Sequence, residues 1–304
     1  MSAVAGSVVV VGSINLDTTL DVARLPDAGE TVLATHLRTA VGGKGANQAA
    51  AAALHGAPTA FVGAVGDDDA GHALLTALRG CGVDVGACRT VTGVPSGQAL
   101  ITVDAAGTNT IVVAAGANDA LTPADTAAVA DAAVVLVQLE IPDATVRAAL
   151  AAGRDAGATT ILNPAPARAL DATLLGLCDI VVPNEHEAAV LTGERSPERA
   201  AAALGTATGA TVVVTCGSRG AWVWRRGALD ALAPFAVEAI DTVAAGDAFC
   251  GVLAAALAEG HPFDAALRRA AAAGALATTV AGALPSLPTR AAVERLLEEP
   301  TIHH

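Results

Sequence analysis

Residues 241–249 read DTVAAGDAF, and this stretch decides how the rest of the chain is interpreted. Small residues at 244–246 precede an apolar segment that runs to about Glu259 and is predicted to be a helix. Small side chains at a helix start leave the backbone N–H groups open, and these donors and the helix dipole together attract an anion. Asp247 lies in the first turn, where a carboxylate can take the proton of a hydroxyl that attacks a phosphoryl group. Taken alone, Asp247 is more simply an ordinary helix-start carboxylate.

A glycine-rich turn at residues 41–48, VGGKGANQ, leads into a second predicted helix. It is not a Walker loop, because Arg38 stands where that pattern needs its first glycine and Gly45 where it needs Ser or Thr. Glycines let the backbone approach a ligand closely. Lys44 and Asn47 would then offer hydrogen bonds to a polyol. The alternative is that these residues form a plain tight turn that binds no ligand.

Asn15 and Asp17 follow the first predicted strand, Val8–Val11. Ligands of open α/β sheets bind beyond the carboxyl ends of the strands. Because Asn15 and Asp17 alternate, both can face one side and bind adjacent hydroxyls; a loop with Asx turns is the alternative. Polar or glycine residues also follow later predicted strands, at Glu140 and in the segments NPAPAR (163–168), PNEHE (183–187) and TCGSRG (215–220).

Short apolar runs alternate with alanine-rich helical stretches, which predicts βαβ units and an α/β fold with a mostly parallel central sheet flanked by helices. We expect strands at 8–11, 60–65, 134–139, 159–162, 180–182 and 211–215, and helices at 45–55 and 71–79. Segments 18–39 and 98–113 carry strands without intervening helices and predict a small antiparallel sheet that covers a cleft or pairs with another subunit. The predicted division is an α/β domain of residues 1–15, 43–97 and 114–304, and a small sheet domain of residues 16–42 and 98–113.

Composition excludes several classes of function. Of 304 residues, 53% are hydrophobic and only 2% aromatic, so the core must be Ala, Val and Leu, and no base-stacking surface is available. The net charge of −13 disfavours nucleic acid and anionic membranes as partners. The five cysteines form no CxxC pair, which predicts reduced thiols. No apolar run reaches the ~18 residues of a membrane span and the start lacks a basic signal segment, so we expect a cytoplasmic protein.

Motifs along nearly the whole chain are shared with one enzyme family. From VVVGSINLD through GGKGANQA, NPAPAR, PNEHEA and TCGSRG to DTVAAGDAF and GALPS, the chain resembles the ribokinase-like (PfkB) carbohydrate kinases. The DTxxAGD signature is specific to that family, and GGKGANQA with NPAPAR points within it to a kinase of D-ribose. The resemblance implies ATP-dependent phosphorylation of the 5-hydroxyl of this small sugar, with Mg²⁺ and K⁺ as cofactors. It also implies that the small sheet is a β lid and the contact of a homodimer.

The same resemblance implies roles for individual residues. The catalytic set is Asp247 as the base, with Ala244, Ala245 and Gly246 as the backbone anion hole for the γ-phosphate. The sugar-binding set is Asn15, Asp17, Gly43, Lys44, Asn47 and Glu140. The ATP-binding set is Asn184, Glu187, Thr215, Gly217, Ser218 and Gly220, with Glu187 positioning hydrated Mg²⁺. The monovalent-cation set is Asp241, Val243, Ala277, Val280, Gly282 and Ser286.

Two other functions remain open from the sequence. The first is a kinase of the same family that acts on deoxyribose, a ketose or a nucleoside. A nucleoside needs an apolar or aromatic base pocket, and four Phe and two Trp are little to build one. The second is a catalytically silent sensor of sugar or nucleotide, which the filled catalytic positions disfavour.

Overall fold

The fold is organised around a sheet built from the short apolar runs. The computed structural model describes residues 6–298; residues 1–5 and 299–304, including His303 and His304, lie outside the described residues. Within the described range the sheet has eight strands, six of them parallel, and a hairpin adds two antiparallel strands at one edge. In spatial order the strands are β14 (Ala228–Leu232), β13 (Ala221–Arg225), β12 (Thr211–Thr215), β11 (Ile180–Val181), β10 (Thr159–Leu162), β9 (Val134–Val137), β1 (Val8–Val11) and β4 (Thr59–Val62).

Both faces of this sheet are covered by helices. Because side chains alternate along a strand, Val8 and Val10 of β1 enter one core cluster, and Val9 and Val11 enter the other. The helices of the first cluster are α1 (Lys44–Leu54), α2 (Asp69–Gly80), α7 (Ala245–Ala258), α8 (Phe263–Ala277) and α9 (Arg290–Glu298). Those of the second are α3 (Asp143–Asp155), α4 (Ala172–Leu175), α5 (Glu185–Thr192), α6 (Pro197–Thr208), and the 3₁₀ segments η1 (Gly116–Ala120) and η2 (Pro123–Asp131). The layers explain why the parallel strands are mostly apolar.

Small residues let α1 and α7 approach each other to backbone contact. A Cβ atom added at Gly251 would lie 2.4 Å from the carbonyl oxygen of Gln48 and 2.7 Å from the Cβ atom of Ala51. Gly251 lies midway along α7 and Gln48 in the second turn of α1, so the contact packs the middle of α7 against the N-terminal half of α1. Among the helices of residues 6–298, none is long and apolar enough for a membrane crossing.

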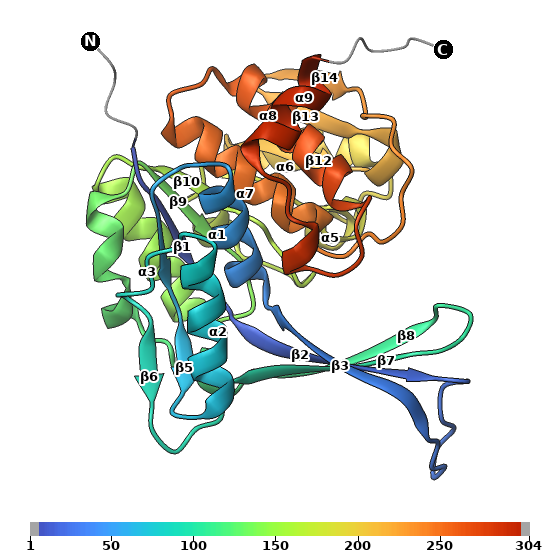
Figure 1. Ribbon diagram of the computed structural model, residues 1–304. Coiled ribbons are helices and arrows are strands. Elements are labelled where there is room, and N and C mark those ends of the chain that lie inside the picture. Colours follow the sequence, from blue (N-terminus) through green and yellow to red (C-terminus); the bar gives the residue numbers. More distant parts are fainter. Residues whose placement is uncertain (1–5, 299–304) are drawn as a thin grey trace.

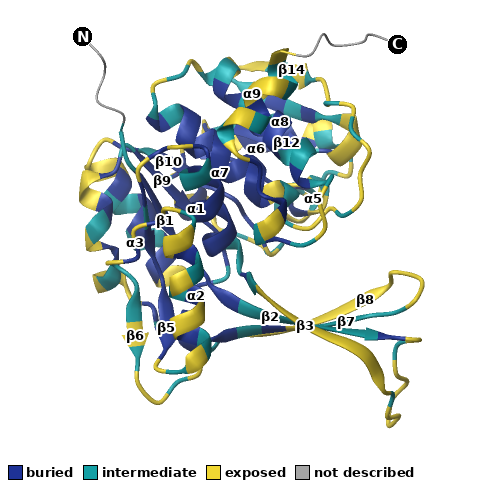
Figure 2. Ribbon diagram, in the orientation of Figure 1, coloured by how far each residue is buried: buried dark blue, intermediate teal, exposed yellow. Residues whose placement is uncertain are grey.

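A second sheet projects away from this body (Figure 1). In spatial order its strands are β3 (Ala34–Gly42), β2 (Asn15–Val22), β7 (Gly97–Val103) and β8 (Asn109–Ala114). The prediction that this sheet is antiparallel is wrong for its central pair, because β2 and β7 run parallel, with Asn15 opposite Gly97 and Asp21 opposite Val103. Both strands leave the α/β body at the same base and run outward, and each returns through its own hairpin partner. Figure 2 shows that much of β3 and β8 is exposed.

The strand predicted at 60–65 is two strands in different sheets. β4 ends at Val62, and β5 (Ala64–Gly66) pairs instead with β6 (Arg89–Val91). The break falls at Gly63, where a Cβ atom would lie 2.3 Å from the ring of Phe61. The predicted strand 134–139 is also shorter, since it ends at Val137 and the next residue, Gln138, turns into a polar network.

Candidate active site

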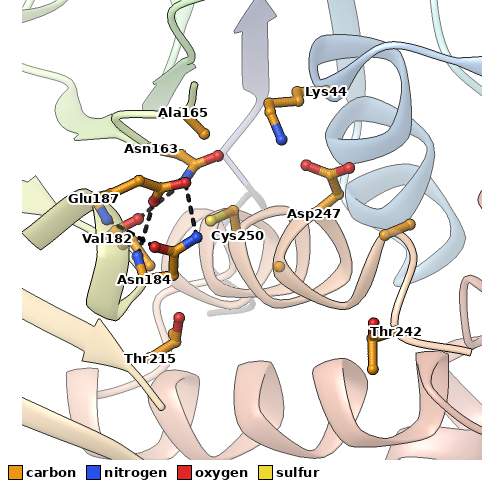
Figure 3. A pocket seen from close by; sticks show the side chains of 12 residues that line it. Lys44, Asn163, Ala165, Val182, Asn184, Glu187, Thr215, Thr242, Asp247 and Cys250 are labelled. Atoms are coloured by element: carbon orange, nitrogen blue, oxygen red, sulfur yellow. Dashed lines mark hydrogen bonds between the residues drawn. The ribbon is translucent and has the colours of Figure 1, made fainter. Parts of the chain in front are cut away.

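Seven of the predicted site residues lie where the carboxyl ends of the central strands meet the beginning of α7. A cavity of about 190 Å³ lies there. Figure 3 shows the side chains of Lys44 and Asp247 pointing toward the same space, with Asn184 and Glu187 on the opposite wall. The lining residues are Lys44, Asn163, Ala165, Val182, Asn184, Glu187, Thr215, Thr242, Ala244, Gly246, Asp247 and Cys250.

The first turn of α7 is left without a side-chain cap. Ala244, at the N-cap position, has a left-handed backbone with φ 59°, and no side chain accepts a hydrogen bond from the helix start. A non-glycine residue in this conformation costs roughly 1–2 kcal/mol. The first N–H groups of a helix have no partner within the helix. The N–H of Ala245 donates to the Thr242 carbonyl at 3.4 Å, so those of Gly246 and Asp247 are the ones available to an anion at the cavity.

Asp247 is 8% exposed, and both its carboxylate oxygens accept hydrogen bonds from amides of α1. Asn47 Nδ2 donates to Oδ2 at 3.0 Å, and Gln48 Nε2 donates to Oδ1 at 2.9 Å. Burial raises the pKa of Asp247, whereas the charge of Lys44 and the two amide donors act in the opposite direction. The carboxylate is therefore oriented from both sides and depends on these donors to stay ionised.

Lys44 is the cation in a group of buried and half-buried carboxylates. Burial lowers the pKa of Lys44, but attraction to Asp247, Glu140 and Glu187 more than offsets this, so the pKa is raised. Glu140 accepts hydrogen bonds from the Ser13 hydroxyl and, at 3.1 Å, from the backbone N–H of Lys44. Burial, and then repulsion by Glu140 and Asp247, raises the pKa of Asp17 to about 7. The structure thus brings Asp17, Lys44 and Glu140 together with Asp247.

Asn15 is held by a residue that sequence reasoning missed. Asn118, in η1, accepts the backbone N–H of Ile14 through Oδ1 at 3.0 Å and donates from Nδ2 to Asn15 Oδ1 at 2.8 Å. The bond to Ile14 fixes the amide of Asn118, so Asn15 must turn its own Nδ2 away from Asn118. Gly43 has φ 87° and packs against this turn, with an added Cβ atom 2.9 Å from the backbone nitrogen of Asn15.

The predicted ATP-binding residues fall into two groups. Asn184, Glu187 and Thr215 line the cavity. Asn184 and Glu187 cap α5 reciprocally, with Glu187 Oε2 accepting the Asn184 N–H at 2.8 Å, and burial raises the pKa of Glu187. The remaining three, Gly217, Ser218 and Gly220, lie in or just after η3 (Gly217–Arg219), beyond the cavity lining. Position 220 also needs a glycine for packing, because an added Cβ atom would lie 2.0 Å from the carbonyl oxygen of Leu232.

Asp241 joins the two segments predicted to form the monovalent-cation site. Its Oδ1 accepts the N–H of Val243 at 3.0 Å and its Oδ2 accepts that of Gly282 at 2.8 Å. The other predicted members are Ala277, buried at the end of α8, Val280, exposed in the following loop, and Ser286, buried in η4 (Leu284–Ser286). Among residues 6–298 no cluster of three or more His, Cys, Asp or Glu side chains could hold a metal ion.

Two further buried amides, Gln138 and Asn163, were given no role by the sequence analysis. Gln138 donates to Gln48 at 2.6 Å, and Gln48 also donates to Asn163 at 3.1 Å. Asn163 stands in the NPAPAR motif, but its role as an acceptor here has no sequence signal of its own. Gln138 has one, because it is a polar residue inside the apolar run 134–139.

Comparison with known proteins identifies the family that this fold and site define. Residues 5–290 match the pfkB family of carbohydrate kinases, and the chain belongs to that family. It is 40% identical over 298 residues to the ribokinase of Haemophilus influenzae, which covers 95% of this chain and 97% of that protein. It is 41% identical over 296 residues to the ribokinase of Bacillus subtilis, covering 96% and 99% respectively.

The solved structures agree with this assignment. The structure of Arabidopsis thaliana ribokinase complexed with ribose and ATP is similar with a TM-score of 0.91 at 36% sequence identity, covering 98% of this chain and 100% of that one. The predicted family and the predicted α/β fold with a mostly parallel central sheet are confirmed.

Proposed function

We propose that this chain is an ATP-dependent sugar kinase that transfers the γ-phosphate of ATP to the 5-hydroxyl of D-ribose, giving ribose 5-phosphate and ADP. The observation that carries the proposal is the buried carboxylate of Asp247 in the uncapped first turn of α7. This arrangement supplies a proton acceptor and a phosphate-binding helix end within one turn. The identity to ribokinases at about 40% over nearly the whole chain supports D-ribose as the sugar.

The groups around Asp17 suit a polyol. Sugar hydroxyls donate and accept hydrogen bonds, so a site for them needs both acceptors and donors. Asp17 and Glu140 are acceptors when ionised, and an ionised carboxylate can bind two adjacent hydroxyls at once. Asn15, whose oxygen is already engaged by Asn118, would present its Nδ2 donor. Asn47 has a buried Oδ1 atom without a partner within the described residues, which a sugar hydroxyl could satisfy.

In the proposed reaction Asp247 accepts the proton of the 5-hydroxyl as that oxygen attacks the γ-phosphorus in line with the leaving ADP oxygen. The N–H groups at the beginning of α7 and the Lys44 ammonium stabilise the negative charge on the phosphoryl oxygens. Electrostatic positioning of this kind provides most of the catalysis of phosphoryl transfer, so the residues around the base matter as much as the base.

The proposal includes two cations. Glu187 has a buried carboxylate whose pKa is raised by burial, so a nearby divalent cation would stabilise its charge, and Mg²⁺ would neutralise the phosphates when bound. The segments joined by Asp241 offer a carboxylate and backbone carbonyls, the hard oxygen donors that suit K⁺. Such an ion would brace the loop that leads into Ala244 without touching the sugar.

We further propose that the small sheet, residues 16–42 and 98–113, is a lid over the sugar and the contact of a homodimer, with the remaining residues as the kinase domain. Support comes from large apolar side chains that this sheet and its tip leave exposed, namely Leu33, Leu37, Leu100, Ile111, Val112 and Val113. Exposed apolar groups gathered in this way are typical of protein contacts. Sedimentation equilibrium would test the dimer. The expected compartment is the cytoplasm, where ATP is available.

The deciding experiment is ADP release from Mg-ATP with a panel of D-ribose, deoxyribose, ketoses and nucleosides, run in K⁺ and again in Na⁺. Turnover with D-ribose that falls when Na⁺ replaces K⁺ is the expected result. Turnover with another substrate alone would move the substrate assignment, and no turnover by folded protein would favour a silent sensor. Turnover that is equal in K⁺ and Na⁺ would remove the proposed K⁺ site and leave the sugar kinase intact.

A further inference from the structure

Three amide side chains form a chain of hydrogen bonds that ends on the Asp247 carboxylate. Gln48 and Gln138 are 0% exposed and Asn163 is 9% exposed. They come from α1, from the turn after β9 and from the turn after β10, so the chain crosses the carboxyl ends of two adjacent strands. None of the three was assigned a role from the sequence.

The bonds permit one orientation of each amide. Gln138 Nε2 donates to Gln48 Oε1 at 2.6 Å, so Gln48 must turn its Nε2 the other way. That nitrogen donates to Asp247 Oδ1 at 2.9 Å and to Asn163 Oδ1 at 3.1 Å. Asn163 is fixed in turn, because its Nδ2 donates to the Val182 carbonyl at 2.9 Å. A reversed amide would place two N–H groups or two oxygens against each other, since an amide nitrogen only donates and its oxygen only accepts.

We propose that Gln48, locked in its orientation by Gln138 and Asn163, is a positioning residue that holds the Asp247 carboxylate ionised and aimed for proton abstraction. This inference rests on the proposed role of Asp247 as the base. Gln48 does not touch the reacting atoms and acts only through Asp247.

Simple packing would not require this arrangement. Apolar side chains would fill the same space without the risk of buried polar atoms left unpaired, each of which costs stability. The chain also limits its neighbours: a Cβ atom at Gly12 would lie 2.0 Å from Gln138 Oε1, so this position must stay a glycine while Gln138 keeps its place. Amides do not ionise, so they orient the carboxylate without offering a route by which the proton could leave it.

The test uses Gln48→Met, which keeps the length of the side chain and removes the donor. Losing a hydrogen bond to a charged acceptor should lower kcat for D-ribose by about 10- to 100-fold. It should also move the acid limb of the kcat–pH profile upward by about one to two pH units, because the pKa of Asp247 rises when a donor to its charged form is lost. KM for ribose should change by less than about threefold, since the change acts on the base.

A second variant keeps the proposal testable if Gln48→Met does not fold. Gln138→Met leaves the Gln48–Asp247 pair in place but frees the Gln48 amide to turn, so it should move kcat and the acid limb the same way by a smaller amount. Thr160→Val is the matched control. Its hydroxyl is buried and bonded to the Leu177 carbonyl at 2.8 Å, near the beginning of the strand whose end leads into Asn163. It should lower stability without moving the pH profile.

Each outcome decides something. Folded Gln48→Met and Gln138→Met with wild-type kcat and an unmoved acid limb would overturn the proposal. So would loss of folding in both while Thr160→Val folds, because the amides would then be structural only. If the wild-type protein turns over no substrate, the proposed function has failed. In that case ¹³C NMR titration of the Asp247 carboxyl group in the wild type and the two variants tests the positioning role without relying on turnover. A higher midpoint in either variant supports the positioning role, and an unchanged midpoint refutes it.

Discussion

Replacing Asp17 by asparagine should make the free protein more stable above pH 7 while weakening its binding of ribose at least tenfold. Asp17 has its pKa raised from 3.8 to about 7, first by burial and then by repulsion from Glu140 and Asp247. The folded state therefore holds this proton more tightly than the unfolded state does. Between pH 4 and 7 the unfolded chain ionises first, and the wild-type protein loses stability as the pH rises through that window. An asparagine side chain at this position stays neutral, so the Asp17→Asn variant escapes the loss.

The size of this effect follows from the shift. About three pH units at 1.36 kcal/mol each give about 4 kcal/mol as an upper value, and partial exposure of Asp17 to solvent reduces this to about 2 kcal/mol. For a chain of 304 residues, that corresponds to a rise in melting temperature of about 3 °C at pH 8 and almost none at pH 4. Ribose affinity should fall at least tenfold, because hydrogen bonds to a charged acceptor are each worth roughly 1.5–3 kcal/mol.

Thermal unfolding at pH 4 and pH 8, and ribose calorimetry at pH 8, measure both quantities. Asp21→Asn is the matched control, because Asp21 lies on the same strand but pairs with Arg38 at the surface, at 2.7 Å. It should change stability by less than about 1 kcal/mol and leave ribose binding intact. A stability difference between wild type and Asp17→Asn that is equal at the two pH values, or unchanged ribose affinity, would refute the reasoning.

Three other changes have definite expected results. Asp247→Asn should bind ribose in calorimetry but lose about 10²–10⁴-fold in kcat, because it removes the proton acceptor. Asn118→Leu should raise KM for ribose about tenfold with little change in kcat, because Asn15 loses the donor at 2.8 Å that fixes its amide. Burial, and then the charge of Arg290, lowers the pKa of His55 to about 4, so stability should fall by about 3 kcal/mol between pH 6.5 and 4 as the unfolded chain binds the proton first. Acid unfolding of His55→Leu should lack that component.

Each of these three expectations has a result that would contradict it. Near-normal turnover by Asp247→Asn would remove it as the base. An unchanged KM in Asn118→Leu would mean that Asn15 does not need its partner to meet the sugar. An acid-unfolding curve for His55→Leu parallel to the wild type would mean that His55 titrates alike in the folded and unfolded chain.

The sequence predicted the central sheet well, because its strands are buried on both faces and are therefore mostly apolar. The predicted strands Val8–Val11, Thr159–Leu162 and Thr211–Thr215 match the observed bounds. The sequence could not predict the direction in which strands of the projecting sheet pair. The pattern of residues in β2 and β7 is the same whether the strands run parallel or antiparallel. The direction of pairing depends only on where the two strands leave the α/β body.

Candidate site residues were found where their position in the chain implies their place in the fold. Asn15, Glu140 and Asn184 each follow a parallel strand, and such strand ends converge at one edge of a sheet. Asn118 and Gln48 were missed as positioning groups because their importance depends on which atoms they meet. No local pattern in the sequence indicates that the amide of Asn118 orients another amide 103 positions away.

The pairing of β2 with β7 also bears on how the chain folds as it is made. The hairpin of β2 and β3 is complete once Gly42 has been synthesised, but the strand that covers its other edge begins only at Gly97. At about 5–20 residues per second, the ribosome leaves that edge open for several seconds. During this time a nascent chain carries a bare strand with apolar residues, which nearby chains on the same polysome could bind. High expression rates should therefore aggregate this protein through its projecting hairpin before its catalytic body has formed.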